Sequence, residues 1–366
     1  MNSSIYQERL ARVQSAMQRQ DIDAVLLSVG HDLPYLTGYH AMALERLTML
    51  VVPREGAATM VIPRLEAPRV TEHPKVFSLL VWNETDDPVA AVARLVNGAR
   101  NIAVGDQMWA RFLVELLTHT PHVSYSRAVH IVGPLRSIKT PTEIEALQRA
   151  GSAADRVARQ LHAGLIPLIG RSEAQVSADI SARLLEEGHN VVNFAIVAAG
   201  ENAASPHHHP GERIIKNNEI VLCDFGGTMD EYCSDITRCV YLGEPSQEVL
   251  EAYGVLQEAQ AASVASAQVG ATCESVDEAA RRVITEAGFG EYFVHRTGHG
   301  IGMEAHEEPY IVAGNTEILV PGHAFSIEPG IYMPGRFGMR LEDIVVASAS
   351  GPIAMNTVSH DLVVLA

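Results

Sequence analysis

The chain is short of basic side chains, and it contains no long apolar run. Its 366 residues include 27 lysines and arginines against 44 aspartates and glutamates, so the net charge is −17. An acidic surface repels phosphate backbones and anionic lipids, and we therefore expect neither nucleic-acid nor membrane partners. No apolar run approaches the ~20 residues of a membrane-spanning helix. Residues 1–20 lack the apolar centre of a signal peptide and indicate an amphipathic helix, which favours a cytoplasmic protein.

Cysteines are few, and none of them forms a CxxC pair. The four are Cys223, Cys233, Cys239 and Cys273. Three of them cluster along the chain, so a thiolate zinc site is one alternative, but the spacing matches no known zinc knuckle. We expect buried free thiols instead.

The length predicts two domains, because one hydrophobic core seldom serves so many residues. Apolar residues make up 47% and charged residues 19%, as in ordinary globular proteins. In the first part of the chain, short apolar runs end at Gly, Pro or Asp, which is typical of strands. They alternate with helical stretches such as residues 87–99, and the alternation predicts an α/β domain through about residue 132. The expected strands lie within residues 23–30, 48–53, 58–63 and 101–106.

A helix start marks the expected domain boundary. Thr140 is a good N-cap, Pro141 suits the first turn, and Glu143 can bond back to the cap. We place the boundary near residues 133–139 and predict domains over 1–135 and 136–366. In the second domain, strands separated by Gly and Pro turns mix with long helices. These helices are expected over about 141–164, 172–187, 246–268 and 273–287.

A hairpin is predicted over residues 219–243, where two strand-like runs flank a turn. A turn centred between Met229 and Asp230 would place Asp224 opposite Asp235. Opposed residues on antiparallel strands have Cβ atoms ~5 Å apart, so the two carboxylates would repel each other. Burial would add to that cost, and a divalent cation between them is the simplest remedy. The alternative is a different register in which both side chains face water.

Further acidic residues stand in apolar surroundings. Glu328 lies in an apolar strand that a Pro-Gly pair stops, and Arg340 shares one face of a strand over 338–346 with Glu342. Each of these alone could be part of a structural ion pair. The two glutamates, Glu328 and Glu342, add to Asp224, Asp235 and His299. The resulting set of four carboxylates and one imidazole suits Mn²⁺, Co²⁺ or Fe²⁺. Four negative charges match two divalent ions.

The segment "TGHGIGMEAHEEPY", residues 297–310, places His299 and His306 among glycines and glutamates. It is either a solvated loop or one wall of a metal site. Glycine would let backbone and metal approach closely. The second interpretation is favoured by the carboxylates elsewhere in the chain.

These segments together resemble the metal-dependent members of the creatinase, prolidase and methionine aminopeptidase superfamily. The matching motifs come in the family's order and spacing, and "YLTGY" at 35–39 resembles the N-terminal domain of prolidases and Xaa-Pro aminopeptidases. The resemblance implies a two-domain α/β fold: a creatinase-like N-terminal α/β domain and a C-terminal α+β catalytic domain of the pita-bread type. The catalytic motifs are "PHH" at 206–208, "DFGGTMDEYCSDITR" at 224–238, "GHGIGMEAHEEP" at 298–309, "IEPGIY" at 327–332 and "RLED" at 340–343.

The resemblance also implies a ligand set for two metal ions, of which Mn²⁺ is the expected one and Co²⁺, Fe²⁺ and Zn²⁺ are alternatives. Asp235 and Glu342 would bridge both ions. Glu328 would also act as general base. The full implied set of ligands is Asp224, Asp235, His299, Glu328 and Glu342.

Other positions match the family's residues around the substrate. His207, seventeen residues before Asp224, matches the histidine that assists the oxyanion, while His208 and His209 have no assigned role. His306 matches the histidine on the leaving-group side, and His295 and Arg340 match supporting positions.

One position departs from the pattern of some prolidases. Tyr310 stands where they carry an arginine for the dipeptide carboxylate. Either another cation supplies that contact, namely Arg340, Arg336 or Arg46 of a partner subunit, or the preference for dipeptides is looser.

The resemblance implies a metallopeptidase that removes a residue preceding proline, most simply from dipeptides, as an Xaa-Pro dipeptidase (prolidase) does. Alternatives are an Xaa-Pro aminopeptidase, a non-peptidase hydrolase or lyase of C–N or C–S bonds, and a binding protein with a structural metal. A homodimer is implied, with residues 39–46, which include His40, Glu45 and Arg46, at the rim of the partner's site. An ordinary loop is the alternative for that segment.

Overall fold

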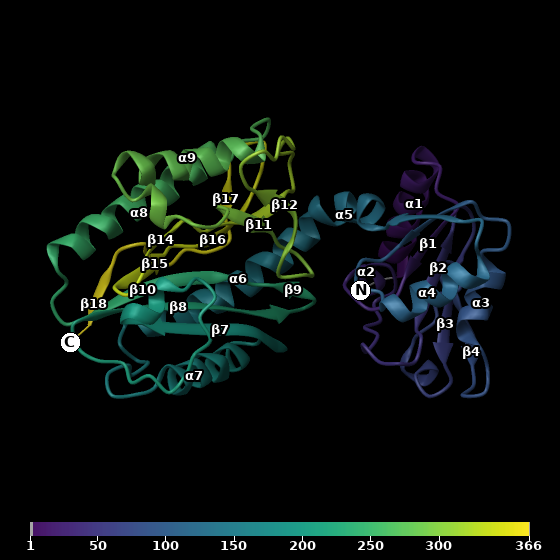
Figure 1. The fold of residues 1–366 in the computed structure, drawn as a ribbon, viewed down its shortest axis with the longest axis horizontal. Helices are drawn as coiled ribbons and strands as arrows, with labels where there is room; N and C mark the ends of the chain where they lie inside the picture. Colours follow the sequence, from purple (N-terminus) through teal and green to yellow (C-terminus); the bar gives the residue numbers. More distant parts are fainter. Residues whose placement is uncertain (1–2, 366) are drawn as a thin grey trace. The chain divides into compact units, whose positions relative to one another are not determined.

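The computed structural model describes residues 3–365, which form two compact units, Met1–Arg136 and Ser137–Ala366 (Figure 1). The first unit is built on one mixed six-stranded sheet in the order β4-β3-β2-β1-β5-β6. Antiparallel β1, β2 and β3 form its centre, and parallel pairs extend both edges. The strands are β1 (Ala24–Leu27), β2 (Met49–Pro53), β3 (Ala58–Pro63), β4 (Phe77–Trp82), β5 (Asn101–Val104) and β6 (Ser124–Arg127).

Helix α1 of the first unit buries one face. On α1, buried Tyr6, Leu10, Val13 and Met17 recur at spacings of three or four residues, the pattern of an amphipathic helix. The helix predicted over residues 1–20 is thus observed, although Met1 and Asn2 lie outside the described residues. The helices are α1 (Ser3–Arg19), α2 (Asp32–Thr37), α3 (Pro88–Leu95), α4 (Ala110–His119) and α5 (Val129–Ser137), and η1 (Ala67–Arg69) is a 3₁₀ turn.

The second unit contains three sheets. The first has the order β18-β10-β8-β7, with β9 added to β8; the second has the order β12-β11-β13-β16-β17; and β14 pairs with β15. The strands of the first sheet are β7 (Val191–Ala199), β8 (Glu219–Met229), β9 (Tyr232–Cys233), β10 (Ile236–Leu242) and β18 (Val363–Leu365). The other strands are β11 (Gly298–Gly300), β12 (Glu307–Ile311), β13 (Ala324–Ile327), β14 (Gly330–Met333), β15 (Phe337–Arg340), β16 (Asp343–Val346) and β17 (Ile353–Ala354).

Four long helices accompany these sheets, close to the ranges that the sequence predicts. The Thr140 hydroxyl accepts a bond from the Glu143 amide while the Glu143 carboxylate accepts one from the Thr140 amide, so the predicted capping box is confirmed. Ser172 and Gln175 form a second box at the next helix. The helices are α6 (Pro141–His162), α7 (Glu173–Glu186), α8 (Gln247–Ser266) and α9 (Cys273–Glu286), with 3₁₀ turns η2 (Gly200–Ala204) and η3 (Gly290–Tyr292).

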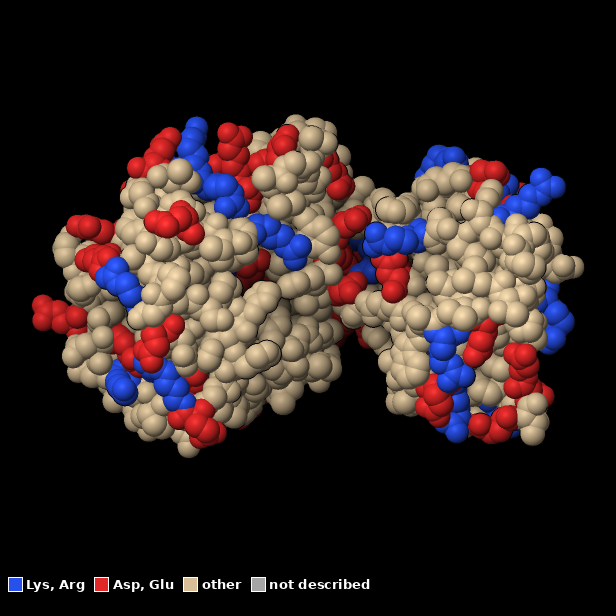
Figure 2. Space-filling model, viewed as in Figure 1, with Lys and Arg blue, Asp and Glu red and all other residues tan. Residues whose placement is uncertain are grey.

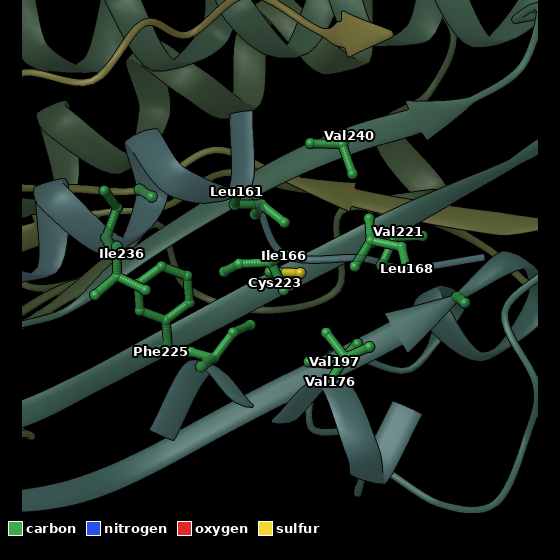
Figure 3. Packing of buried hydrophobic residues seen from close by; sticks show 14 of the residues in the cluster. Leu161, Ile166, Leu168, Val176, Val197, Val221, Cys223, Phe225, Ile236 and Val240 are labelled. Atoms are coloured by element: carbon green, nitrogen blue, oxygen red, sulfur yellow. The ribbon is translucent and has the colours of Figure 1, made fainter. Parts of the chain in front are cut away.

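Strand β8 is buried on both faces. Successive side chains point to opposite sides of the sheet, so alternate residues enter different hydrophobic clusters. Val221, Cys223 and Phe225 pack with Leu161 of α6 and Val176 of α7 in the cluster of Figure 3. The alternate residues Ile220 and Leu222 enter a second cluster with α8, α9, β14 and β15. Asp224 has the same parity as Ile220 and Leu222, so it lies on this second face.

All four cysteines are buried free thiols, as predicted. Burial raises the pKa of the Cys233 thiol to about 11. In the part of the chain that is described, no helix is long and apolar enough to cross a membrane. The face seen in Figure 2 carries acidic and basic side chains interspersed.

Candidate metal centre

Asp224 and Asp235 lie on one face of the β8–β10 hairpin, but they are not directly opposed. Asp224 pairs with Thr237, so the predicted register is wrong by two residues. The turn is made by Asp230 and Glu231, whose φ angles of 50° and 74° are left-handed, and it is centred one position later than predicted. A shift of two residues preserves the face of a strand. Asp235 is therefore a diagonal neighbour of Asp224, and ligand oxygens of these two residues and of Glu342 all lie within 4.8 Å of one another.

Glu328 and Glu342 approach from the second sheet. Glu328 directly follows β13, where the Pro-Gly pair ends the strand as predicted. The single strand predicted over 338–346 is instead two strands, β15 and β16, interrupted at Leu341 and Glu342. Glu342 forms an isolated bridge with Thr237, because its amide donates to the Thr237 carbonyl. The interruption brings Glu342 to the hairpin that carries both aspartates.

His299, on β11, presents one ring nitrogen to the carboxylates. Its Nδ1 lies 3.1 Å from the Gly300 carbonyl oxygen, which can only accept, so Nδ1 carries the proton. Nε2 therefore offers its lone pair, 3.2 Å from Glu328 Oε1 and 3.8 Å from Asp235 Oδ2. The Ser326 hydroxyl accepts the His299 amide and donates to Glu328 Oε1, both at 3.0 Å, which fixes the two ligands relative to each other.

The donor set fits divalent cations. The Oδ1 atoms of Asp224 and Asp235 are buried, and neither has a hydrogen-bond partner among the described residues. A buried carboxylate oxygen without a partner is costly unless a cation satisfies it. Burial and the neighbouring carboxylates raise the pKa of Asp235 and of Glu342 well above the ordinary range.

Arg340 connects a candidate metal ligand to the hydrogen-bonded residues around the site. Its Nη2 donates to Asp224 Oδ2, its Nε donates to Thr237 Oγ1 at 3.0 Å, and its Nη1 donates to the Tyr332 hydroxyl at 2.9 Å. Tyr332 in turn lies 2.8 Å from Nε2 of His295, whose Nδ1 lies 2.7 Å from the Arg296 carbonyl oxygen. His295 and Arg340, both expected as supporting residues, thus belong to one hydrogen-bonded chain. Thr237 extends the chain to Glu342 through a 2.6 Å bond.

A pocket of about 890 Å³ opens over these residues. Such a volume is within the range of small-molecule sites. Phe194 and Ile196 of β7 form an apolar wall, and His207, His306 and Arg296 line the remainder. The ring centroids of His306 and His299 are 3.8 Å apart. Desolvation within the pocket and the charge of Arg296 lower the pKa of His306 to about 4, although the residue keeps an exposed surface.

Three other predicted substrate residues lie apart from the ligands. Tyr310 is outside the pocket lining, and its ring carries the Arg296 guanidinium, with Cζ 4.2 Å from the centroid. Arg336 is exposed and paired with Glu248. Arg46 belongs to the first unit, where it pairs with Glu45 and with Glu84.

The chain was compared with known proteins. Residues 145–349 match the model of metallopeptidase family M24, and residues 9–138 match the creatinase/prolidase N-terminal domain. The chain belongs to metallopeptidase family M24. The resemblance inferred from the motifs and the two-domain fold class are thereby confirmed.

Relatives of this M24 chain include dipeptidases. It is 43% identical over its whole length to the probable dipeptidase PepE of Mycobacterium tuberculosis, covering 98% of that protein. The crystal structure of dipeptidase PepE from Mycobacterium ulcerans is similar, with a TM-score of 0.92 at 43% identity, over 100% of this chain and 99% of that one. A prolidase from Thermococcus sibiricus has a TM-score of 0.94 at 34% identity, with both chains fully covered.

Several residues around this M24 site were not predicted. Thr237 and Tyr332 lie inside the motifs at 224–238 and 327–332, so the sequence placed them near the site. Their role depends on contacts with Arg340, which the sequence does not show. Ser326 could have been suspected from its spacing of two before Glu328, which puts both on one face. Glu173 and Arg296 carried no signal, because their partners are set by packing.

Proposed function

We propose that this M24 metallopeptidase is a dinuclear-metal Xaa-Pro dipeptidase, which hydrolyses the bond between an N-terminal residue and a C-terminal proline. The observation that carries the proposal is the convergence of four carboxylates and one imidazole in one pocket, with two buried carboxylate oxygens lacking a partner among the described residues. The likeness to a prolidase supports the Xaa-Pro class.

Five residues would hold two divalent ions. Asp235 and Glu342 would bridge them, since their carboxylates lie close together between the hairpin and the second sheet. Four carboxylate charges match two divalent ions, and oxygen-rich ligation with one imidazole favours Mn²⁺, with Co²⁺, Fe²⁺ or Zn²⁺ as alternatives. When bound, such a pair supplies Lewis acidity at the scissile carbonyl and lowers the pKa of water. The ligands would be Asp224, Asp235, His299, Glu328 and Glu342.

The remaining chemistry belongs to side chains of this chain. Glu328, which lines the pocket beside His299, would act as general base and accept a proton as water adds to the carbonyl carbon. That proton passes to the proline nitrogen as the C–N bond breaks. His207 and His306, which line the pocket, would donate hydrogen bonds to the oxygen that becomes negative. Because its pKa is lowered, His306 is neutral at pH 7 and donates as an imidazole N–H.

A homodimer is part of the proposal. The segment 39–46 of one subunit, with His40, Glu45 and Arg46, would border the pocket of its partner. In that arrangement Arg46 would face the far end of the substrate.

The test is a panel of Xaa-Pro dipeptides, matching C-terminal amides and longer Xaa-Pro peptides, assayed with the metal-free protein reloaded with Mn²⁺, Co²⁺ or Zn²⁺. Hydrolysis of the free dipeptides in preference to longer peptides is expected. Equal cleavage of longer peptides would make the protein an Xaa-Pro aminopeptidase. No cleavage of any peptide would overturn the proposal in favour of a C–N or C–S hydrolase or lyase on the same fold.

A further inference from the structure

Arg296 is a cation that lines the pocket. The pocket contains two arginines, Arg296 and Arg340. Arg340 is bound to Asp224 and lies 3.9 Å from Glu328, so its charge is already balanced within the site. Within residues 3–365, by contrast, no carboxylate lies within 4.0 Å of the Arg296 guanidinium. An arginine that lines an acidic pocket without pairing to any of its carboxylates is available to a ligand.

The guanidinium of Arg296 is held in a defined orientation. Its Cζ lies 4.2 Å from the centroid of the Tyr310 ring, a cation–π contact. Stacking engages one face of the planar group and leaves its in-plane N–H donors directed past the ring. The backbone that carries the ring is anchored, because Tyr310 lies on β12 and its carbonyl accepts a 2.6 Å bond from Asn315 Nδ2.

The backbone on both sides of Arg296 is also fixed. Its carbonyl oxygen accepts the 2.7 Å bond from His295. The next residue, Thr297, donates its amide at 3.0 Å and its hydroxyl at 2.8 Å to Oδ1 of buried Asp277. A donor fork preset in this way loses little conformational entropy when a ligand binds.

A dipeptide substrate requires such a cation. Its C-terminal carboxylate must enter a pocket that already holds the side chains of Asp224, Asp235, Glu328 and Glu342. In the proposed function the two metal ions balance these four carboxylates, so none of the metal charge neutralises the substrate's own carboxylate. That carboxylate loses water in the pocket and needs a positive partner on the leaving-group side. Arg296 lies on the side of His306, and its charge is one of those that act on that imidazole.

We propose that Arg296, stacked on Tyr310, binds the C-terminal carboxylate of the dipeptide and thereby selects free Xaa-Pro dipeptides over longer peptides. This rests on the proposed function. It gives Tyr310 a part as the platform for the cation. Some prolidases carry an arginine at the position of Tyr310. Here the cation would instead come from the loop just before β11, the strand that pairs with β12.

The experiment compares Ala-Pro with Ala-Pro amide on the full-length, metal-loaded protein and three variants. A charge-assisted, bidentate contact predicts that the wild type prefers the free dipeptide by about 10–150-fold in kcat/KM. Arg296→Met should remove that preference by raising KM for Ala-Pro and should leave the amide nearly unaffected. Arg296→Lys should restore part of it, since a point charge attracts the carboxylate without matching its fork. Arg336→Met is the matched control and should keep the full preference, because Arg336 pairs with Glu248 outside the pocket.

A binding measurement gives a readout apart from turnover. Titration calorimetry with L-proline and L-prolinamide should show that Arg296→Met weakens proline alone. Metal content and circular dichroism should stay at wild-type values. If Arg296→Met folds poorly, Tyr310→Leu provides the second test, because losing the platform should reduce the preference for Ala-Pro by several-fold.

The two proposals fail in different ways. Absence of turnover of every Xaa-Pro substrate by the wild type would overturn the proposed function. Turnover with a preference for Ala-Pro that survives in Arg296→Met, or proline binding that the variant does not weaken, would overturn the assignment of Arg296 alone.

Discussion

His208 Nε2 lies 2.8 Å from Oε2 of Glu173, a carboxylate with no exposed surface. Glu173 also accepts the Ala199 amide at 2.9 Å and the Asn202 side-chain amide at 3.0 Å. The buried Glu173 carboxylate, at the start of α7, thus bonds to residues before, within and after the 3₁₀ turn η2, which leads to the "PHHH" segment at 206–209. His208 therefore has a structural role although it also lines the pocket, and its bond to Glu173 helps to position its neighbour His207 in the same lining.

Glu173→Gln should disturb catalysis through the position of His207. The amide keeps the volume but loses the charge and one acceptor, so His208 and the turn are held less firmly. We expect kcat to fall about 10–100-fold, the scale associated with small misplacements near the chemistry. KM and metal content should change little. Glu274→Gln, in the first turn of α9, is the control, and equal kcat values in the two variants would contradict this role.

Asp235→Asn should abolish turnover and lower the metal content of the loaded protein, because a bridging carboxylate loses its charge. The fold should survive, since asparagine fills the same space. Metal analysis and circular dichroism on the same samples provide the measurement. Near-normal activity with full metal loading would refute the dinuclear assignment.

In the metal-free protein, Asp235→Asn should stabilise the fold relative to wild type as the pH rises. The pKa of Asp235 is raised in the folded state, so the folded protein binds the proton more tightly than the unfolded chain does. That stability is present below the unfolded pKa of about 3.9 and is lost as the pH rises through the raised folded value. The Tm of metal-free Asp235→Asn, relative to wild type, should therefore increase between pH 4 and pH 8. A difference that stays constant over this range would show that Asp235 does not titrate there.

His306→Ala should reduce kcat by about 10²–10⁴, the range for a positioned proton-transfer or oxyanion-stabilising group. Both metals should remain bound. His306 also forms a geometrically possible metal group with Asp235 and His299, so metal analysis decides between the two roles. Loss of one ion would reassign His306 as a ligand.

The protein should be a homodimer in solution, as measured by light scattering. Arg46→Ala should then reduce the preference for free dipeptides more than Arg336→Ala does, because Arg46 would lie at the partner's pocket, but less than Arg296→Met, because Arg296 would contact the carboxylate itself. A fully active monomer would argue against the rim assigned to residues 39–46, and Arg46 would be left with its partners Glu45 and Glu84.

Local signals in the sequence were sufficient for the four long helices of the second unit. Thr140, Pro141 and Glu143 act on one another within a single turn, so the start of α6 follows from their order alone. The candidate ligands were also visible, because carboxylates in apolar strands are rare and their motifs came in the order of a known family. Those are properties of short segments, which a sequence displays directly.

Tertiary structure decided the relationships between distant segments. The hairpin register depended on left-handed backbone at Asp230 and Glu231, which no residue type demanded. The contact of His208 with Glu173 spans 35 residues, and that of Arg296 with Tyr310 joins separate segments of the second unit. The sequence by itself determined which side chains could hold metal and where helices begin, because capping and strand alternation act over a few residues. Only packing decided which charges are balanced within the site and which remain available to a substrate, because that balance depends on distances between segments far apart in the chain.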